Sequence, residues 1–311
     1  LDAVTSYYTG DDLKNIEFLT WLNNTIKKQK EDAYIVGECW TNSSTYSKYY
    51  RSGVDSFFDF DFAGSEGIIA GVARGTSAAA NYGKALEKIE SQLAGISDTA
   101  IDAPFYTNHD MARSAGYYTG KGSQDKIKLA GGLNLLMTGN AFIYYGEELG
   151  MKGSGKDENK RAPMQWSAAD HTGMCKGPAD MDKFDMKYPA LDEQAADEYS
   201  IYNYYKSAIK LRNMFPVIAR GKTVVADAFS DGDISAFVRE KKDGSSYETD
   251  VESLLILINT SEESKEVDIS ADDVSKDYTK LVYNLCTGKE KCGYNGGKVT
   301  IPAYGIAVLS K

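Results

Sequence analysis

The sequence is poor in metal-binding residue types and in positive charge. Its 311 residues include only two histidines and four cysteines, scattered along the chain, which do not form a zinc set, and we assign no metal ligands. The 45 acidic residues outnumber the 35 Lys and Arg and leave a formal charge of −10. Because nucleic-acid binding depends on clustered Lys and Arg, this charge argues against a nucleic-acid partner.

Long apolar runs are also missing. No stretch approaches the roughly 20 residues that a membrane span needs, and no signal peptide is visible. The chain is nevertheless 42% hydrophobic, so at this length it can bury a large core and is expected to hold two domains. Aromatic residues make up 12% of the sequence, which suits a sugar-stacking surface and an ordinary core equally well.

Three acidic residues stand at the ends of short apolar runs. Asp2 and Glu38 are 36 residues apart, and Glu38 and Asp110 are 72 apart. These intervals match one and two βα units of roughly 30 to 40 residues, and the strand that the second interval skips is visible at 54–60. A further run follows at 141–145. Continuous apolar runs predict buried parallel strands, whose carboxyl ends meet on one face.

Helical periodicity lies between these runs, at 13–30, 84–93 and 124–137, and again at 195–213. The intervening stretch 150–192 has no clear period and is rich in Gly, Asp, Lys and Met. A connection of this length is typical of a functional or mobile segment.

The period changes to two from about residue 215. Asp-Gly and Asn-Gly-Gly turns separate the runs, which indicates antiparallel strands. The predicted strands are 223–229, 234–239, 254–259, 281–283 and 306–309. The pattern predicts an α/β domain over 1–214, followed by an antiparallel β-sandwich over 215–311.

Five segments carry a family resemblance: Leu1-Asp2-Ala3-Val4, Gly37-Glu38, Asn108-His109-Asp110, 142–151 and 161–166. In order and context they resemble the α-amylase family of retaining α-glucan hydrolases and transglycosylases, across nearly the whole chain. The resemblance implies the second half of a (β/α)8 barrel that begins at its own nucleophile, followed by the sandwich. It also implies that this chain is an enzyme.

The resemblance assigns a role to each acidic residue. Asp2 would be the nucleophile, Glu38 the acid/base and Asp110 the group that stabilises the transition state. Retaining hydrolysis needs the first two carboxyl groups about 5 to 5.5 Å apart. Apolar neighbours of Glu38 would raise its pKa and keep its proton near neutral pH.

Substrate contacts follow from the same resemblance. His109 and Asn108 would bind sugar in the subsite of Asp110, and Trp40 would line it. Arg113 and Arg161 are further candidates, although both could equally form surface ion pairs.

Ala3, directly after the nucleophile, favours α-1,4-glucans such as starch and maltooligosaccharides, because relatives that cut α-1,6 bonds commonly have Val there. An α-glucosidase, an oligo-1,6-glucosidase and a glucanotransferase remain alternatives. So does a non-catalytic amylase-like fragment, against which the surviving carboxylates argue.

The expected partners are an α-glucan and a missing N-terminal half, or a second half-barrel, that completes the barrel. No cofactor is certain, and calcium is expected only in that missing half. Cys286 and Cys292 flank a five-residue turn, so their Cα atoms could lie within the ~4.4 to 6.8 Å that a disulfide requires. We predict a bridge there, against the alternative of two reduced thiols. A bridge and polymer-degrading chemistry both favour an extracellular or cell-surface location.

Overall fold

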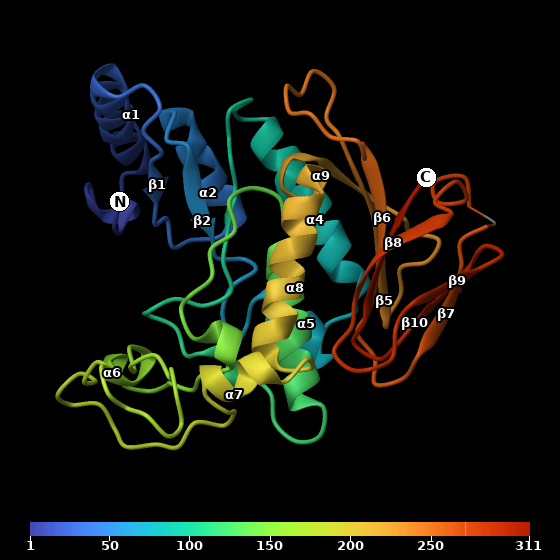
Figure 1. Cartoon of the computed structure of the whole chain (residues 1–311). Helices are drawn as coiled ribbons and strands as arrows, with labels where there is room; N and C mark the ends of the chain where they lie inside the picture. Colours follow the sequence, from blue (N-terminus) through green and yellow to red (C-terminus); the bar gives the residue numbers. More distant parts are fainter. Residues whose placement is uncertain (271) are drawn as a thin grey trace.

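The structure is a computed structural model that describes residues 1–270 and 272–311 (Figure 1). Its helices are α1 (Asp12–Gln29), α2 (Ser43–Tyr49), α3 (Ile68–Arg74), α4 (Ala80–Ala94), α5 (Ser123–Leu136), α6 (Asp157–Lys160), α7 (Leu191–Ala196), α8 (Ile201–Met214) and α9 (Pro216–Arg220). Its strands are β1 (Val36–Gly37), β2 (Ser56–Asp59), β3 (Ala103–Pro104), β4 (Lys222–Val225), β5 (Ile234–Glu240), β6 (Ser253–Asn259), β7 (Lys265–Asp268), β8 (Lys280–Leu285), β9 (Gly293–Asn295), β10 (Lys298–Ile301) and β11 (Ile306–Ser310). None of the helices described is long and apolar enough to cross a membrane.

A parallel sheet positions the acidic residues. Strands β1, β2 and β3 pair in parallel in that order. The first residues continue this ladder beyond β1, because Glu38 N–H donates to the Leu1 carbonyl (2.8 Å) and Val4 N–H donates to the Glu38 carbonyl (2.9 Å). On the far side, Phe105 forms a parallel bridge with Phe142. The five predicted runs therefore lie side by side, in sequence order, with their carboxyl ends at one edge.

Helices around this sheet follow the predicted periodicity closely. Helix α1 begins at an Asp11 cap, whose side chain accepts from the Lys14 N–H at 3.1 Å. Helices α5 and α8 pack closely in the middle of the molecule (Figure 1). At their contact a Cβ on Gly131 would lie 2.4 Å from the Tyr205 ring, so only glycine fits there.

The helix predicted over 195–213 is confirmed in its main part by α8, but it begins later than predicted, because residues 197–200 separate α8 from the end of α7. Ser200 begins α8 by accepting from the Asn203 N–H at 3.1 Å. Its own hydroxyl donates to the Gln194 carbonyl at 2.7 Å. These bonds stabilise a turn between the helices that the apolar spacing does not reveal.

Two antiparallel sheets form the C-terminal part, at the right of Figure 1. One has the order β4-β5-β6-β11-β8 and the other β7-β10-β9. Apolar side chains from both sheets form one buried cluster, which includes Leu255, Leu257, Ile269, Val299 and Leu309. All five predicted strands are present, but the first of them, β4, ends at Val225 rather than at residue 229. Strands β7, β9 and β10 were not predicted. The domain boundary after residue 214 stays a prediction; α9 follows it before β4 begins.

Among the described residues, the irregular stretch 150–192 contains the short helix α6 and the first two residues of α7, and it loops out at the lower left of Figure 1. Apolar side chains of this stretch, among them Met151 and Ala162, form a small separate cluster together with Leu149. The segment is thus a packed, long loop beside the edge where the parallel strands end.

Candidate active site

Asp2 and Glu38 line one cleft at the carboxyl edge of the parallel sheet. The cleft encloses about 280 Å³. Its other lining residues are Leu1, Phe58, Phe105, Asn108 and His109. Two carboxyl groups therefore share a site whose floor is aromatic.

The backbone before Glu38 fixes its position. Gly37 leaves no room for a side chain, since a Cβ there would lie 2.6 Å from the Phe57 ring. Ala3 adopts the left-handed conformation (φ 42°, ψ 51°), which is uncommon for a residue with a Cβ. Its N–H then donates to Glu38 Oε2 at 3.1 Å. Ala3, which directly follows Asp2, thus holds the Glu38 carboxylate in place.

The surroundings of Glu38 raise its pKa. Burial is the main cause, and the hydrogen bond from the Ala3 N–H opposes it. Asp2 and Asp110 raise the pKa further, because negative charges nearby disfavour a second one. Burial and the neighbouring negative charges thus both act in favour of the protonated form of Glu38.

Asp110 is held by cationic and polar side chains. Arg161 Nη2 lies 3.1 Å from Asp110 Oδ1, and His109 Nε2 lies 3.4 Å from Oδ2. Lys160 Nζ donates to the Asp110 carbonyl at 2.9 Å. Asn108 Oδ1 accepts the Asp110 N–H at 2.9 Å and thereby shapes the turn. The long loop 150–192 thus supplies Arg161 and Lys160 to the site.

Trp40 lies beyond Glu38, outside the lining of the cleft. Its ring stacks on Phe60 with centroids 4.8 Å apart and an interplanar angle of 16°. The residue remains 53% exposed, so one face of the indole is open to solvent.

Arg113 does not reach the cleft, which corrects the expectation of a substrate contact or a surface ion pair. The residue is fully buried. Its Nε donates to the Lys160 carbonyl at 3.1 Å, and Nη1 donates to the Tyr145 carbonyl. The guanidinium lies 4.6 Å from the centroid of the Tyr144 ring. Arg113 therefore connects the long loop 150–192, through Lys160, to the segment that ends at Tyr145.

The floor of the cleft was not predicted from the sequence. Phe58 packs edge to face with Phe105 at 5.3 Å and with Phe142 at 4.9 Å. The signal was present, since alternation along a strand places Phe58 and Phe60 on one face and Asp59 on the other. No pattern in the sequence indicated that Lys160 would contact Asp110.

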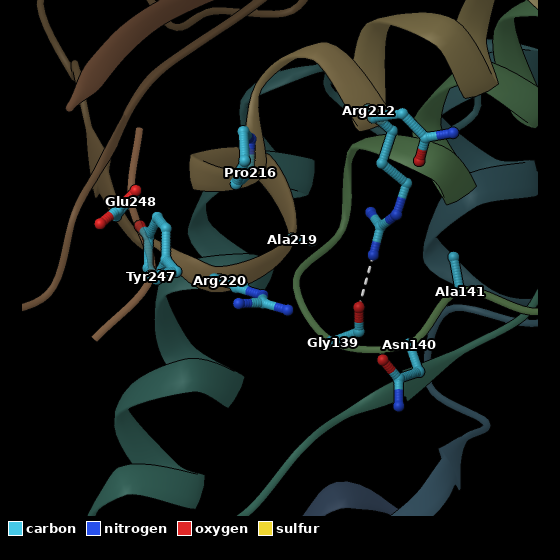
Figure 2. A pocket seen from close by; sticks show the side chains of 10 residues that line it. Gly139, Asn140, Ala141, Arg212, Pro216, Ala219, Arg220, Tyr247 and Glu248 are labelled. Atoms are coloured by element: carbon cyan, nitrogen blue, oxygen red, sulfur yellow. Dashed lines mark hydrogen bonds between the residues drawn. The ribbon is translucent and has the colours of Figure 1, made fainter. Parts of the chain in front are cut away.

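A larger cavity of about 690 Å³ is lined by Gly139, Asn140 and Ala141, just before the segment in which Phe142 bridges to Phe105 (Figure 2). Arg212 points into it and donates to the Gly139 carbonyl, as Figure 2 shows. Burial lowers the pKa of Arg212 to about 10. Only Glu248 is acidic among its lining residues, so this cavity does not offer the carboxyl pair of the smaller cleft.

Within 1–270 and 272–311, no three His, Cys, Asp or Glu side chains come together in a way that could hold a metal ion. This part of the chain thus offers no candidate metal site.

Comparison with known protein families gives a match to the model "Alpha amylase, catalytic domain" over residues 2–221. The chain belongs to the α-amylase family. The matched range includes every residue of the cleft except Leu1, and it ends where strand β4 begins.

Named relatives agree with this membership. The α-amylase family chain is 36% identical over 225 residues to "Alpha-amylase 3" of Dictyoglomus thermophilum, covering 71% of this chain and 43% of that protein. It is 31% identical over 241 residues to "Alpha-amylase SusG" of Bacteroides thetaiotaomicron, covering 74% of this chain and 33% of that one.

Solved structures are similar over nearly the full length. "Eubacterium rectale Amy13B" matches with a TM-score of 0.92 and 42% identity, covering 99% of this chain and 59% of that chain. An α-amylase from H. orenii matches with a TM-score of 0.76 and 27% identity, covering 96% and 57%. This α-amylase family chain thus spans less than two thirds of the relatives it matches.

Proposed function

We propose that this chain contributes the catalytic carboxylates of a retaining glycoside hydrolase that acts on α-glucans. One observation carries the proposal: Asp2 and Glu38 line a single cleft, and the burial of Glu38 together with the charge of Asp2 raises the pKa of Glu38. A pair of carboxyl groups in different protonation states is what acid-assisted displacement requires.

The reaction would proceed in two displacements. Glu38 donates its proton to the glycosidic oxygen while the Asp2 carboxylate attacks the anomeric carbon, so the carbon–oxygen bond breaks and a glycosyl ester forms on Asp2. Glu38, now ionised, then takes a proton from water, whose oxygen attacks the same carbon and releases Asp2. Both carboxyl groups return to their starting states.

Asp110 would bind sugar hydroxyls and stabilise the positive charge of the transition state. Its ion pair with Arg161 and its contact with His109 keep the carboxylate in place beside Asn108 and the cleft. The open face of Trp40 would stack on a sugar ring. These roles favour a ligand with several hydroxyl groups and apolar faces, as in an α-glucan.

We place the substrate among α-1,4-glucans, such as starch and maltooligosaccharides. Ala3 after the proposed nucleophile supports this choice, and so do the α-amylase names of the relatives above. An α-glucosidase is the second candidate, because a protein with that name from Apis mellifera matches 97% of the chain at 22% identity. Polymeric substrate favours an extracellular or cell-surface location.

We further propose that the parallel strands are the second half of a (β/α)8 barrel, that the two antiparallel sheets are a sandwich domain, and that an N-terminal half or a second half-barrel closes the barrel. The segment that begins at Leu1 and the strand around Phe142 are the two edges of the described parallel sheet. Leu13 and Trp21 on α1 are also largely exposed, as expected for a helix face that a neighbouring element covers.

Comparing two substrates in the complete protein tests the roles of Glu38 and Asp2. Glu38→Gln should lower turnover of maltooligosaccharides by about 10²- to 10⁴-fold. It should lower turnover of maltosyl fluoride much less, because fluoride leaves without a proton. Asp2→Asn should lose both activities and should no longer accept a covalent fluorosugar label. Glu248→Gln, outside the cleft, is the control. If Glu38→Gln retains more than half of the wild-type turnover, the acid is elsewhere.

A further inference from the structure

Two cysteines lie side by side where the two antiparallel sheets meet. Cys286 directly follows β8 of the five-stranded sheet, and Cys292 directly precedes β9 of the three-stranded sheet. Their Sγ atoms are 3.7 Å apart. Both are free thiols, so the bridge predicted from the sequence is absent here, although the predicted proximity is present. Cys292 is only 7% exposed and Cys286 is half-buried.

The two thiols differ chemically. The hydrogen bond from Cys292, helped by Lys291, lowers the pKa of Cys286. The same contact and burial raise the pKa of Cys292. Cys286 is therefore the thiol that ionises first, and a thiolate is the form that reacts with disulfides.

The segment between the cysteines also touches the helices. Lys128 of α5 donates through its ammonium group to the Thr287 carbonyl at 2.8 Å and to the Tyr199 carbonyl. Lys291 lies 5.7 Å from the centroid of the Tyr199 ring. A cavity of about 490 Å³ opens beside Cys286, between this segment and the α7–α8 connection. A small reagent can therefore approach Cys286.

We propose that Cys286 and Cys292 are a reversible redox pair that forms a disulfide by exchange with a low-molecular-weight disulfide of the glutathione class. The Cys286 thiolate attacks one sulfur of the reagent, a mixed disulfide forms, and one thiolate leaves. Cys292 then loses its proton, attacks the Cys286 sulfur and expels the second thiolate. The protein loses two electrons and two protons, and the reagent is reduced to two thiols.

The bond would join the two sheets at the segment that contacts the helices. The sulfurs must move from 3.7 Å to a bonding distance of about 2.05 Å, which needs only a local side-chain adjustment. Because the closed loop is short, the gain in stability is modest, and we expect the thermal midpoint to rise by about 2–5 °C. Neither cysteine lines the cleft that contains Asp2 and Glu38, so activity should not depend on the disulfide.

Digestion with trypsin tests the pair directly. Lys289 and Lys291 lie between the cysteines, so cleavage places Cys286 and Cys292 on different peptides unless a disulfide joins them. After incubation with oxidised glutathione and blocking of free thiols, we expect one joined pair of peptides, 281–289 with 292–298, which dithiothreitol separates.

The controls use the other cysteines. Cys175 is exposed and Cys39 is buried. Cys175→Ser should form the same joined peptides and show the same rise in the thermal midpoint, whereas Cys286→Ser and Cys292→Ser should show neither. The wild-type digest needs no variant to fold. The proposal is overturned if both cysteines are recovered fully blocked, if Cys286 stops at the mixed disulfide, or if either one pairs with Cys175.

Discussion

Arg239 of β5 and Glu90 of α4 form an ion pair that is buried between the antiparallel sheet and the helices. Arg239 is completely buried, and its Nη2 also donates to the Leu136 carbonyl at 2.9 Å. Glu90 accepts the Thr223 N–H at 2.6 Å and the Thr138 hydroxyl at 3.1 Å. The pair thus joins α4, the end of α5 and two strands by groups that are largely shielded from water.

Removing one partner of this pair should be costly. Glu90→Ala leaves the Arg239 charge buried without a counter-ion, and we expect the free energy of unfolding to fall by about 3–5 kcal/mol. Urea denaturation measures the loss. Glu266→Ala, which breaks the exposed pair between Lys298 and Glu266, should leave the unfolding midpoint unchanged. An equal loss in both variants would show that burial does not decide the effect.

The pH dependence of activity should follow the pKa of Glu38. The acid acts only while protonated, so a raised pKa extends activity toward higher pH. Asp110 is one cause of the raised pKa. In Asp110→Asn, turnover falls, and the alkaline limb of kcat/KM should move to lower pH. Asp243→Asn, an exposed change in the C-terminal part, should leave the limb in place. An unmoved limb in Asp110→Asn would argue that another group titrates there.

Asp59 should make the protein less stable as pH rises. Burial, and the nearby charge of Asp61, raise the pKa of Asp59 to about 7. Because the folded pKa exceeds the unfolded value near 4, its stabilising contribution is complete below pH 4 and is lost as pH rises toward 7. The buried groups that face it are Tyr46 and Asp102. Asp59→Asn should therefore stabilise the protein by about 1–3 kcal/mol at pH 8 and change little at pH 4.

Thermal unfolding at both pH values measures this difference. Asp243→Asn at an exposed turn is the control, and its effect should not change with pH. A gain from Asp59→Asn that is the same at pH 4 and pH 8 would mean that packing, not ionisation, is responsible.

The sequence predicted those parts of the fold in which one face or one strand is buried throughout. Helices α1, α4 and α5 are present where the 3.6-residue spacing places them, and the parallel segments lie in the predicted order. The missed strands are short and partly solvent-facing: in β7 only Val267 of four residues is buried. Such strands exist because neighbouring strands pair with them, which is a tertiary effect that local pattern does not contain.

Prediction of the site residues from the sequence meets the same limit, because tertiary contacts decide where some of them lie. The motif around Asp110 was recognisable from adjacent residues, and its neighbours His109 and Asn108 line the cleft. Arg113 was misread because three residues of spacing do not reveal which way a side chain points at a loop. Its burial depends on Tyr144 and Tyr145, more than thirty residues away. The contact of Lys160 with Asp110 likewise depends on how a long loop folds back.

Arg161 provides the test of that loop's role in the site. Arg161 Nη2 lies 3.1 Å from Asp110 Oδ1, and its Nη1 lies 4.0 Å from Oδ2 of the exposed Asp157. Arg161→Ala should therefore free Asp110 to move away from its position beside the cleft. Misplacement of a catalytic group by about 1 Å can cost on the order of 10²-fold in rate, so we expect kcat/KM to fall by about 10- to 100-fold. Arg161→Lys should restore part of this, because it keeps the charge but not the reach. Lys156→Ala breaks an exposed pair with Asp182 in the same loop and should leave kcat/KM unchanged. Equal losses from Arg161→Ala and Lys156→Ala would point to general loosening of the loop. A loss confined to Arg161→Ala would mean that the loop 150–192 acts on the site through the ion pair of Arg161 with the Asp110 carboxylate.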